Sequence, residues 1–363
     1  MKISMVISTL LSGGAERNTC MLANYFAKKN DVSLITLQKS KYCFYKLSNK
    51  VKINNLDLLK PSKTPFAKIW NFFKRVYLIR FQLQKEKPEV LISFLETTNL
   101  TVIIASLFLK GIRVKIISDR NNPLFTENNF FLYFLKIIFY KFTDILILQT
   151  NKIKENYKFF DKKKIKIIPN TISNNINPKM NYLLDKKINI ICVGRLEYQK
   201  GYEILLKSLK LLKKDNINFN CDIYGEGSQK IDILKKIKFF HLSKNVKLKG
   251  VKKNILNIYK SYDIYILSSK FEGFPNSLLE ALSSGLACIS SDCDYGPKEI
   301  IKNRKNGILF KNNNYLDLYK KLKYLISNKK VICLYGNQAK VDFRCEKYNE
   351  DKLIKWKNII KIN

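Results

Sequence analysis

The sequence predicts an α/β protein of two domains, each a doubly wound parallel sheet covered by helices. Short apolar runs of strand length alternate with longer segments in which apolar residues recur at helical spacing. At 363 residues the chain is long enough to bury two separate cores. A polar stretch, 173–187, interrupts the alternation, and we interpret it as a linker between a first domain, 1–172, and a second, 188–345.

In the first domain, six apolar runs are predicted strands, with helices between most of them. These runs are Lys2–Ser8, Val32–Leu37, Val90–Phe94, Val114–Ser118, Ile145–Gln149 and Lys166–Ile168. The first strand leads into Gly13 and Gly14 and then a helix from about Ala15 to Lys28. Glycines in such a turn let backbone approach a ligand closely and free the amides of the next helix. Two glycines alone indicate only a tight connection.

The second domain shows the same alternation. Its predicted strands are Ile188–Val193, Phe219–Tyr224, Val246–Leu248, Ile264–Leu267 and Ala287–Ser290. The remaining residues, 346–363, include a last helix, from about Asp351 to Ile362, that the spacing of its apolar residues predicts.

The best-defined unit runs from 264 to 290 and predicts a strand, a loop, a helix and a second strand. Asn276 opens the helix, and Gly285 ends it before the next buried strand. In such βαβ units, ligands bind where the carboxyl ends of the strands meet the helix N-termini. We therefore expect a binding site at the start of this helix.

The start of this helix has the properties of a phosphate site. Ser277, Leu278 and Leu279 are expected to present unpaired backbone amides and the positive end of the helix dipole. Glu272 lies before them on the loop and Glu280 after them on the helix. Carboxylates on both sides of a phosphate indicate a nucleotide-sugar, one accepting from sugar hydroxyls and the other from the ribose. An arbitrary pair at this spacing would more often be two solvated charges.

The stretch EGFPNSLLEALSSG, followed by GPKEII and NGILF, resembles the family 4 glycosyltransferases. The resemblance implies the GT-B fold, with two Rossmann-like domains facing across a cleft, and a last helix that returns to the first domain. It also implies retaining transfer of a sugar from a nucleotide-sugar held by the second domain. Glu272 and Glu280 match the family's E-x7-E element and would position the donor sugar and the ribose. In the first domain, SGGAER resembles the family's Gly-rich loop facing the cleft, so Gly13 and Gly14 would also contact the donor.

Two further elements of the second domain match the family. Arg195 and Lys200 lie in a GRL…QKG element after the first strand of this domain. Their charges suit a diphosphate leaving group, on which negative charge grows as the sugar–phosphate bond breaks. Gly194 begins this loop, and Gly225 and Gly227 follow the next strand, where we expect them to let backbone border the donor's nucleotide.

The first domain departs from the family at one strand end. Relatives often carry a histidine after an acidic residue there, whereas Arg120 follows Asp119 in this chain. Either residue is a candidate for a role in the cleft, and the acid–base assignment stays open. Eight cysteines without a CxxC pair, and His241 as the only histidine, predict no metal site or other cofactor.

The charge of +38 is extreme, and lysine supplies most of it. It is compatible with compositional drift, with an anionic membrane surface or with nucleic acid. Pro65–Lys85 and Asn129–Phe142 mix aromatic and basic residues, which is typical either of core helices or of helices at a membrane interface. No apolar run is long enough to span a bilayer, and no signal peptide is evident. We expect a cytoplasmic protein bound peripherally to the inner face of the membrane.

The sequence therefore predicts a glycosyltransferase. The resemblance of GPKEII to branches of the family implies a UDP-sugar donor, a hexose or N-acetylhexosamine, and a lipid-linked surface glycan as acceptor. A nucleotide-sugar 2-epimerase of the same fold is one alternative, although it would need acid–base groups that a chain with one histidine hardly offers. A nucleic-acid-binding protein is the other, but it predicts clustered arginines, so no nucleic-acid partner is expected.

Overall fold

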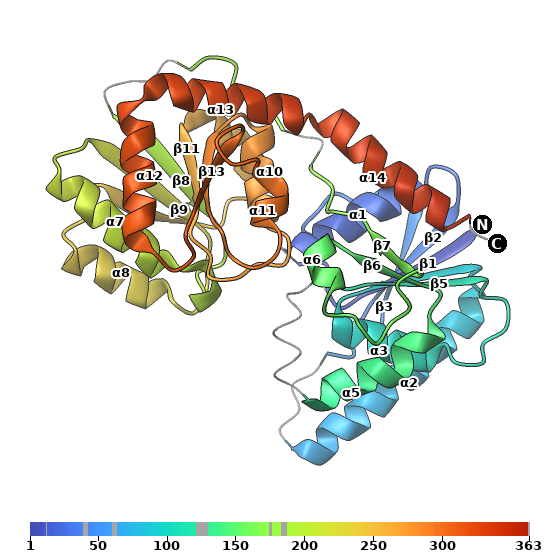
Figure 1. The fold of residues 1–363 in the computed structure, drawn as a ribbon. Coiled ribbons are helices and arrows are strands. Elements are labelled where there is room, and N and C mark those ends of the chain that lie inside the picture. Colours follow the sequence, from blue (N-terminus) through green and yellow to red (C-terminus); the bar gives the residue numbers. More distant parts are fainter. Residues whose placement is uncertain are drawn as a thin grey trace. The chain divides into compact units, whose positions relative to one another are not determined.

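The computed structural model describes residues 1–11, 13–38, 43–59, 64–120, 130–173, 176–182 and 187–361. The chain divides into two compact units (Figure 1): unit 1 comprises Met1–Thr171 with Glu350–Asn363, and unit 2 comprises Ile172–Asn349. Of the predicted linker, positions 174–175 and 183–186 lie outside the described residues, as do 362–363 at the end of the predicted last helix.

Unit 1 is built on a parallel seven-stranded sheet in the order β3-β2-β1-β4-β5-β6-β7. Its strands are β1 (Lys2–Ile7), β2 (Asp31–Thr36), β3 (Val51–Asn55), β4 (Val90–Phe94), β5 (Val114–Ser118), β6 (Ile145–Leu148) and β7 (Ile165–Ile167). The six predicted strands are confirmed to within one residue at each end. Sequence analysis missed β3, an edge strand whose residues are mostly exposed, because only buried strands read as apolar runs.

Helices cover both faces of this sheet. They are α1 (Gly14–Phe26), α2 (Pro65–Glu86), α3 (Glu96–Ala105), α5 (Phe130–Phe139) and α6 (Asn151–Lys154), with the short helix η1 (Tyr140–Phe142). Ile3 and Met5 of β1 share a core with α1, whereas Val6, on the opposite face, packs with α2 and α3. The chain ends in α14 (Cys345–Ile359), whose Trp356 is buried in the first of these cores.

Unit 2 has a parallel six-stranded sheet in the order β10-β9-β8-β11-β12-β13. Its strands are β8 (Ile188–Val193), β9 (Phe219–Tyr224), β10 (Val246–Gly250), β11 (Ile264–Leu267), β12 (Ala287–Ser291) and β13 (Gly307–Phe310). Its helices are η2 (Tyr198–Lys200), α7 (Tyr202–Lys214), α8 (Lys230–Phe239), α9 (Ile255–Ile258), η3 (Tyr259–Ser261), α10 (Asn276–Ser283), α11 (Pro297–Ile300), α12 (Tyr315–Ser327) and α13 (Lys329–Asp342). The predicted α/β class, with two parallel sheets, is confirmed.

The predicted βαβ unit is also confirmed. β11 and β12 are adjacent and parallel, with Ile264 beside Ala287, and α10 connects them. Leu278 and Leu282 on α10 are fully buried against the sheet. The helix ends at Ser283 with Ser284 as its C-cap, and the next residue, Gly285, has a left-handed φ of +82° that favours glycine. Local sequence chemistry thus accounts for the end of the helix that carries the candidate site.

Candidate functional site

The candidate residues of unit 2 lie at the switch point of its sheet. β8 is the first strand of the sheet, with β9 on one side and β11 on the other. Adjacent parallel strands end at the same edge, so the loop after β8 and the loop after β11 meet there. Hydrogen bonds join the two loops: Ser268 Oγ donates to the Lys200 carbonyl at 2.8 Å, and the Lys270 amide donates to the Gln199 carbonyl at 2.8 Å.

Two predicted catalytic residues form a direct ion pair across these loops. Lys200 Nζ lies 2.5 Å from Glu272 Oε1, and the two side chains are only 14% and 6% exposed. The hydroxyl of Ser269 donates to the same carboxylate oxygen at 2.6 Å. Sequence analysis treated Lys200 and Glu272 as contacts to different parts of a donor. The structure adds that each neutralises the other, so neither charge is buried alone.

Arg195, the third predicted catalytic residue, is in a different environment. Its side chain is exposed, and Nη2 donates to Gln199 Oε1 at 3.3 Å. The loop therefore presents one arginine to solvent and one lysine already engaged by a carboxylate. Arg195 is available to an incoming anion, whereas Lys200 would bind an anion while it remains paired with Glu272.

Glu280 is buried on α10 and is held by a tyrosine. The hydroxyl of Tyr259, itself fully buried in η3, donates to Glu280 Oε2 at 3.1 Å. One turn earlier, Ser277 is partly exposed and its Oγ accepts from the Tyr265 hydroxyl at 2.8 Å. Asn276, the first residue of the helix, is also partly exposed. A polar, partly buried helix start with a carboxylate behind it is thus present.

One expectation about this helix start is wrong. The amides of Leu278 and Leu279 are not unpaired, because both donate to the carbonyl of Pro275, at 3.2 and 3.4 Å. Pro275 is the N-cap, and the first turn closes on it with the tight bonds common at helix termini. The side chains of both leucines are fully buried in the core. A phosphate would have to be bound by the amides before Leu278, by side chains or by the helix dipole.

The glycines of unit 2 bring two loops into close contact. A Cβ at Gly225, where φ is +146°, would lie 1.9 Å from the Gly194 carbonyl oxygen, and one at Gly227 would lie 2.5 Å from that of Leu196. At Gly194 itself, a Cβ would lie 3.2 Å from Lys200 Cε. These glycines therefore let the loop after β9 support the loop after β8 and leave room for the Lys200 side chain. This packing accounts for them without any contact to a nucleotide.

In unit 1, the predicted glycines form the start of α1. Gly13 is the N-cap in extended conformation, its amide donates to the Tyr45 hydroxyl at 3.2 Å, and Gly14 is the first helical residue. A Cβ at Gly13 would lie 2.0 Å from Glu16 Oε2, so a larger residue would displace that carboxylate. The turn follows β1, at the carboxyl edge of the unit 1 sheet.

Asp119 lies at the end of β5 inside a fully buried polar cluster. Its carboxylate accepts from Asn99 Nδ2 at 2.6 Å and from the hydroxyls of Tyr140 and Tyr157 at 2.9 and 2.5 Å. Lys136 Nζ lies 3.4 Å away and also binds Glu96, at 2.9 Å. Burial, and then the charge of Asp119, raise the pKa of both tyrosines well above the usual range. Asp119 is therefore a saturated acceptor in the core of unit 1.

For Asn129–Phe142, which the sequence left open between a core helix and a membrane-interface helix, the structure shows both kinds of side chain within the described residues. Lys136 is buried, whereas Phe131 and Phe134 on the same helix are exposed. Sequence analysis missed the cluster, although one lysine inside the apolar run FFLYFLKIIF is a usable signal. A lysine that is buried on a helix, as Lys136 is, needs a carboxylate partner.

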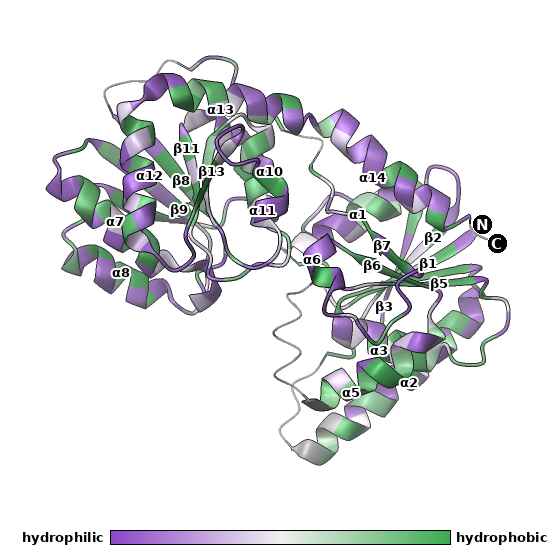
Figure 2. Cartoon of the chain, in the orientation of Figure 1, coloured by the Kyte–Doolittle hydropathy of each residue, from purple (hydrophilic) through white to green (hydrophobic). Residues whose placement is uncertain are grey.

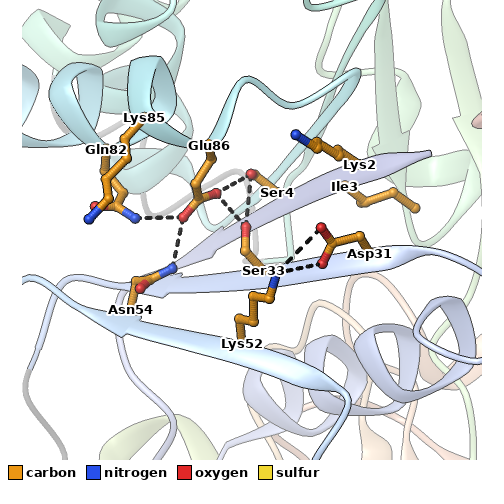
Figure 3. A pocket seen from close by; sticks show the side chains of 10 residues that line it. All are labelled: Lys2, Ile3, Ser4, Asp31, Ser33, Lys52, Asn54, Gln82, Lys85 and Glu86. Carbon is orange, nitrogen blue, oxygen red and sulfur yellow. Dashed lines mark hydrogen bonds and ion pairs between the residues drawn. The ribbon is translucent and has the colours of Figure 1, made fainter.

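A separate hollow of about 300 Å³ lies at the amino-terminal part of β1, β2 and β3 (Figure 3). The ten residues that line it include none of the predicted site residues. Glu86, at the end of α2, points into it and accepts from Asn54 Nδ2 at 2.8 Å, from Gln82 Nε2 at 2.7 Å and from the hydroxyls of Ser4 and Ser33. These bonds attach α2 to the sheet, which is a structural role.

Among the described residues, no three His, Cys, Asp or Glu side chains come close enough together to hold a metal ion. The charged groups at the unit 2 switch point that could act on a substrate are Glu272, Lys200, Arg195 and Glu280. Such a set can bind hydroxyl groups and stabilise phosphate charge.

Comparison with known proteins gives the family. Residues 175–341 match the family described as "Glycosyl transferases group 1". Over 96% of this chain and 94% of the relative, the sequence is 32% identical to the GalNAc-alpha-(1->4)-GalNAc-alpha-(1->3)-diNAcBac-PP-undecaprenol alpha-1,4-N-acetyl-D-galactosaminyltransferase of Campylobacter jejuni. Over 93% of this chain and 94% of the relative, it is 28% identical to the N-acetylgalactosamine-N,N'-diacetylbacillosaminyl-diphospho-undecaprenol 4-alpha-N-acetylgalactosaminyltransferase of the same organism.

The fold is shared with solved structures. A mutant of S. aureus TarM in complex with Fondaparinux, alpha-GlcNAc-glycerol and UDP superposes with a TM-score of 0.81 over 99% of this chain and all of that one, at 17% identity. The relatives support a transferase and not the 2-epimerase alternative. This chain belongs to the group 1 glycosyltransferases, the GT-B family that its sequence resembles, and is a glycosyltransferase.

Proposed function

We propose that this enzyme transfers a hexose or N-acetylhexosamine, with retention of anomeric configuration, from a UDP-sugar to a lipid-linked surface glycan. Support for the acceptor class comes from the two Campylobacter jejuni relatives, whose names specify undecaprenol-linked saccharides. The TarM complex contains UDP, which favours a uridine donor here. Both relatives are N-acetylgalactosaminyltransferases, which favours an N-acetylhexosamine.

The chemistry would take place at the switch point of unit 2. The acceptor hydroxyl attacks the anomeric carbon on the face from which the diphosphate leaves. Its oxygen–carbon bond forms as the bond to the β-phosphate breaks, and its proton passes to the departing phosphate oxygen. Arg195 and Lys200 stabilise the charge that grows on that diphosphate. Glu272 holds the sugar and Glu280 the ribose, each accepting hydroxyl hydrogen bonds.

The buried Lys200–Glu272 pair supports this proposal most directly. A carboxylate that already binds a lysine at 2.5 Å is held rigidly before substrate arrives. When the diphosphate binds, Lys200 lies beside both the sugar-binding carboxylate and the leaving group. The ammonium group of Lys200 would therefore link binding of the sugar by Glu272 to stabilisation of the leaving diphosphate.

A screen of the purified protein against UDP- and GDP-sugars tests the donor. We expect UDP-N-acetylhexosamines to raise the melting temperature and to be hydrolysed slowly without acceptor. Glu272→Gln should abolish the hydrolysis, because glutamine keeps the shape of the side chain but loses the charge that binds the sugar hydroxyls and pairs with Lys200. Stabilisation by GDP-sugars alone would contradict the proposed donor. A product with inverted anomeric configuration, read from its anomeric proton coupling, would contradict retention.

We further propose that unit 1 binds an anionic membrane surface. The 22-residue helix α2 exposes an apolar stripe at helical spacing, and Trp70 within it is 65% exposed. The stripe consists of Phe66, Ile69, Trp70, Phe73, Tyr77 and Phe81. Sequence analysis left open whether these aromatics were core or surface, and the structure shows that they are surface. An exposed apolar stripe of this length needs a partner.

The helix α5 carries a second exposed apolar face. α5, coloured largely green in Figure 2, exposes Phe131, Phe134 and Ile137, and α3 contacts both α5 and α2. The exposed cations nearby in the sequence are Lys74 and Lys85 on α2 and Lys141 in η1, directly after α5. Across the described ranges, no helix is both long and apolar enough to cross a bilayer. Aromatic side chains beside lysines on a +38 protein favour an anionic lipid surface over an apolar protein partner.

Vesicle co-sedimentation tests this. We expect recovery with anionic vesicles at 0.1 M salt and loss at 1 M, because the Debye length falls from about 10 Å to about 3 Å. Trp70→Ser should weaken recovery. The matched control is Phe239→Ser on α8 of unit 2, which removes an aromatic residue that is 75% exposed and should change nothing. Equal recovery with neutral vesicles, or equal effects of both variants, would contradict the membrane surface.

A further inference from the structure

Asp119 and Arg120 follow each other at the end of β5, yet their surroundings are opposite. Every acceptor position of Asp119 is engaged, by Asn99, Tyr140, Tyr157 and Lys136. The next side chain, Arg120, contacts a different set of residues, namely Phe94, Ser118 and Asn170. Of the two candidates that sequence analysis left open, only Arg120 keeps unused hydrogen-bonding capacity.

Arg120 is a buried cation without an anionic partner among the described residues. It is 7% exposed and lies over the Phe94 ring at 5.6 Å. Nε donates to Ser118 Oγ at 3.0 Å, and Nη1 donates to Asn170 Oδ1. Nη2 is buried and, counting only the described part of the chain, has no acceptor, nor does any carboxylate there form an ion pair with this guanidinium. Burial lowers the pKa of Arg120 to about 9, which leaves it charged at neutral pH.

Asn18, which binds the residue next to Asn170, carries a second buried donor that has no acceptor in the described part of the chain. Asn18, on α1, accepts through Oδ1 from the amide and the hydroxyl of Thr171, at 3.2 and 2.9 Å. These two bonds determine its orientation, so Nδ2 points away from Thr171, and among the described residues it has no acceptor. Thr171 directly follows Asn170, the partner of Arg120. Arg120 and Asn18, whose donors Nη2 and Nδ2 are unsatisfied among the described residues, are thus bound to the consecutive residues Asn170 and Thr171.

Backbone strain occurs at the same edge of the sheet. Leu95, between β4 and α3, has φ of +73° and ψ of +136°, a conformation that non-glycine residues rarely adopt. Its amide donates to the carbonyl of Ser118, two residues before Arg120, at 3.1 Å. The strand order reverses between β1 and β4, so this edge is the switch point of the unit 1 sheet, where α/β proteins bind ligands.

We propose that Arg120, with Asn18 as a second donor, binds a diphosphate group of a substrate at the carboxyl edge of the unit 1 sheet. A diphosphate oxygen supplies a negative charge to pair with Arg120 and accepts the hydrogen bonds that Nη2 and Nδ2 do not make within the described part of the chain. The inference rests on the proposed function, in which both the UDP-sugar and a lipid-linked acceptor carry a diphosphate.

Binding of three probes to variants tests this site. The probes are inorganic pyrophosphate, UDP and geranyl diphosphate, measured by calorimetry on the full chain. Arg120→Gln should weaken pyrophosphate binding about tenfold to a hundredfold, the usual value of one charge-assisted hydrogen bond. Arg113→Gln, which removes an exposed arginine before the start of the same strand, is the matched control and should bind like wild type.

The two sources of diphosphate give different results. Weakened binding of UDP, with uridine binding unchanged, assigns the site to the donor. Weakened binding of geranyl diphosphate alone assigns it to the acceptor. If Arg120→Gln does not fold, Arg120→Lys keeps the charge without the planar fork and should weaken pyrophosphate binding less. Wild-type affinity for all three probes in the variant that folds would overturn the proposal.

Failure of the proposed function is a separate result. A wild-type protein that binds pyrophosphate in an Arg120-dependent manner, yet transfers no sugar from any UDP-sugar, would keep the diphosphate site and remove the donor assignment. Asn18→Ala offers an internal check. It should weaken pyrophosphate binding less than Arg120→Gln, because a neutral donor contributes less than a charged one.

Discussion

Replacing Lys200 by methionine separates the structural and catalytic consequences of the Lys200–Glu272 pair. Methionine keeps much of the side chain's length and removes its charge. Glu272, 6% exposed, would retain only the Ser269 hydroxyl as a partner among those described above. Removing one member of a buried ion pair costs about 3–5 kcal/mol, because the other charge stays buried without compensation. Arg195→Met removes an exposed cation whose bond to Gln199 is 3.3 Å long, so it should cost less than about 0.5 kcal/mol.

The two variants should therefore differ in stability and agree in turnover. Urea denaturation should show a lower midpoint for Lys200→Met and an unchanged one for Arg195→Met. The kcat of both variants should fall by more than about tenfold, because each lacks one of the two cations that stabilise the charge growing on the leaving diphosphate. Adding Glu272→Gln to Lys200→Met should recover part of the lost stability, which a double-mutant cycle measures as coupling. Equal stability of the two single variants would refute the buried ion pair as the source of the effect.

The remaining predictions concern the second carboxylate and the buried cluster of unit 1. Glu280→Gln should weaken UDP binding by about tenfold or more in calorimetry, because an amide keeps only part of a charge-assisted bond to ribose, and unchanged affinity would exclude a ribose contact. Lys136→Met should lower the free energy of unfolding by about 3–5 kcal/mol, since Glu96 and Asp119 lose their cation, whereas Lys141→Met at an exposed position should be neutral. Although burial alone would lower it, the charges of Asp119 and Glu96 raise the pKa of Lys136. Its stabilisation is therefore complete below the unfolded value of about 10.4 and is lost as pH rises through the higher folded value. A pH titration of unfolding should show this alkaline loss in wild type and not in Lys136→Met.

Sequence alone determined most of the secondary structure and the position of the unit 2 site. Buried parallel strands are continuous apolar runs, so β4, β5, β8, β9 and β11 were predicted with the bounds that the structure shows. The sequence also predicted the start of helix α10 at Asn276 and its end before Gly285, whose left-handed conformation is local chemistry. Two edge strands, β3 and β13, were not predicted. The residues of β3 are mostly exposed and form no apolar run.

Only the tertiary structure decided which charged groups meet and which apolar faces stay uncovered. Lys200 and Glu272 are 72 residues apart, and a contact at that separation depends on strand order, which periodicity does not encode. A helical pattern gives the apolar side of α2 but not whether another element covers it, and the structure leaves Phe66, Trp70 and Phe73 exposed. The unsatisfied donor of Arg120 is likewise a property of its packed surroundings. Burial is set by the whole fold, so its consequences for charge cannot be read from local sequence.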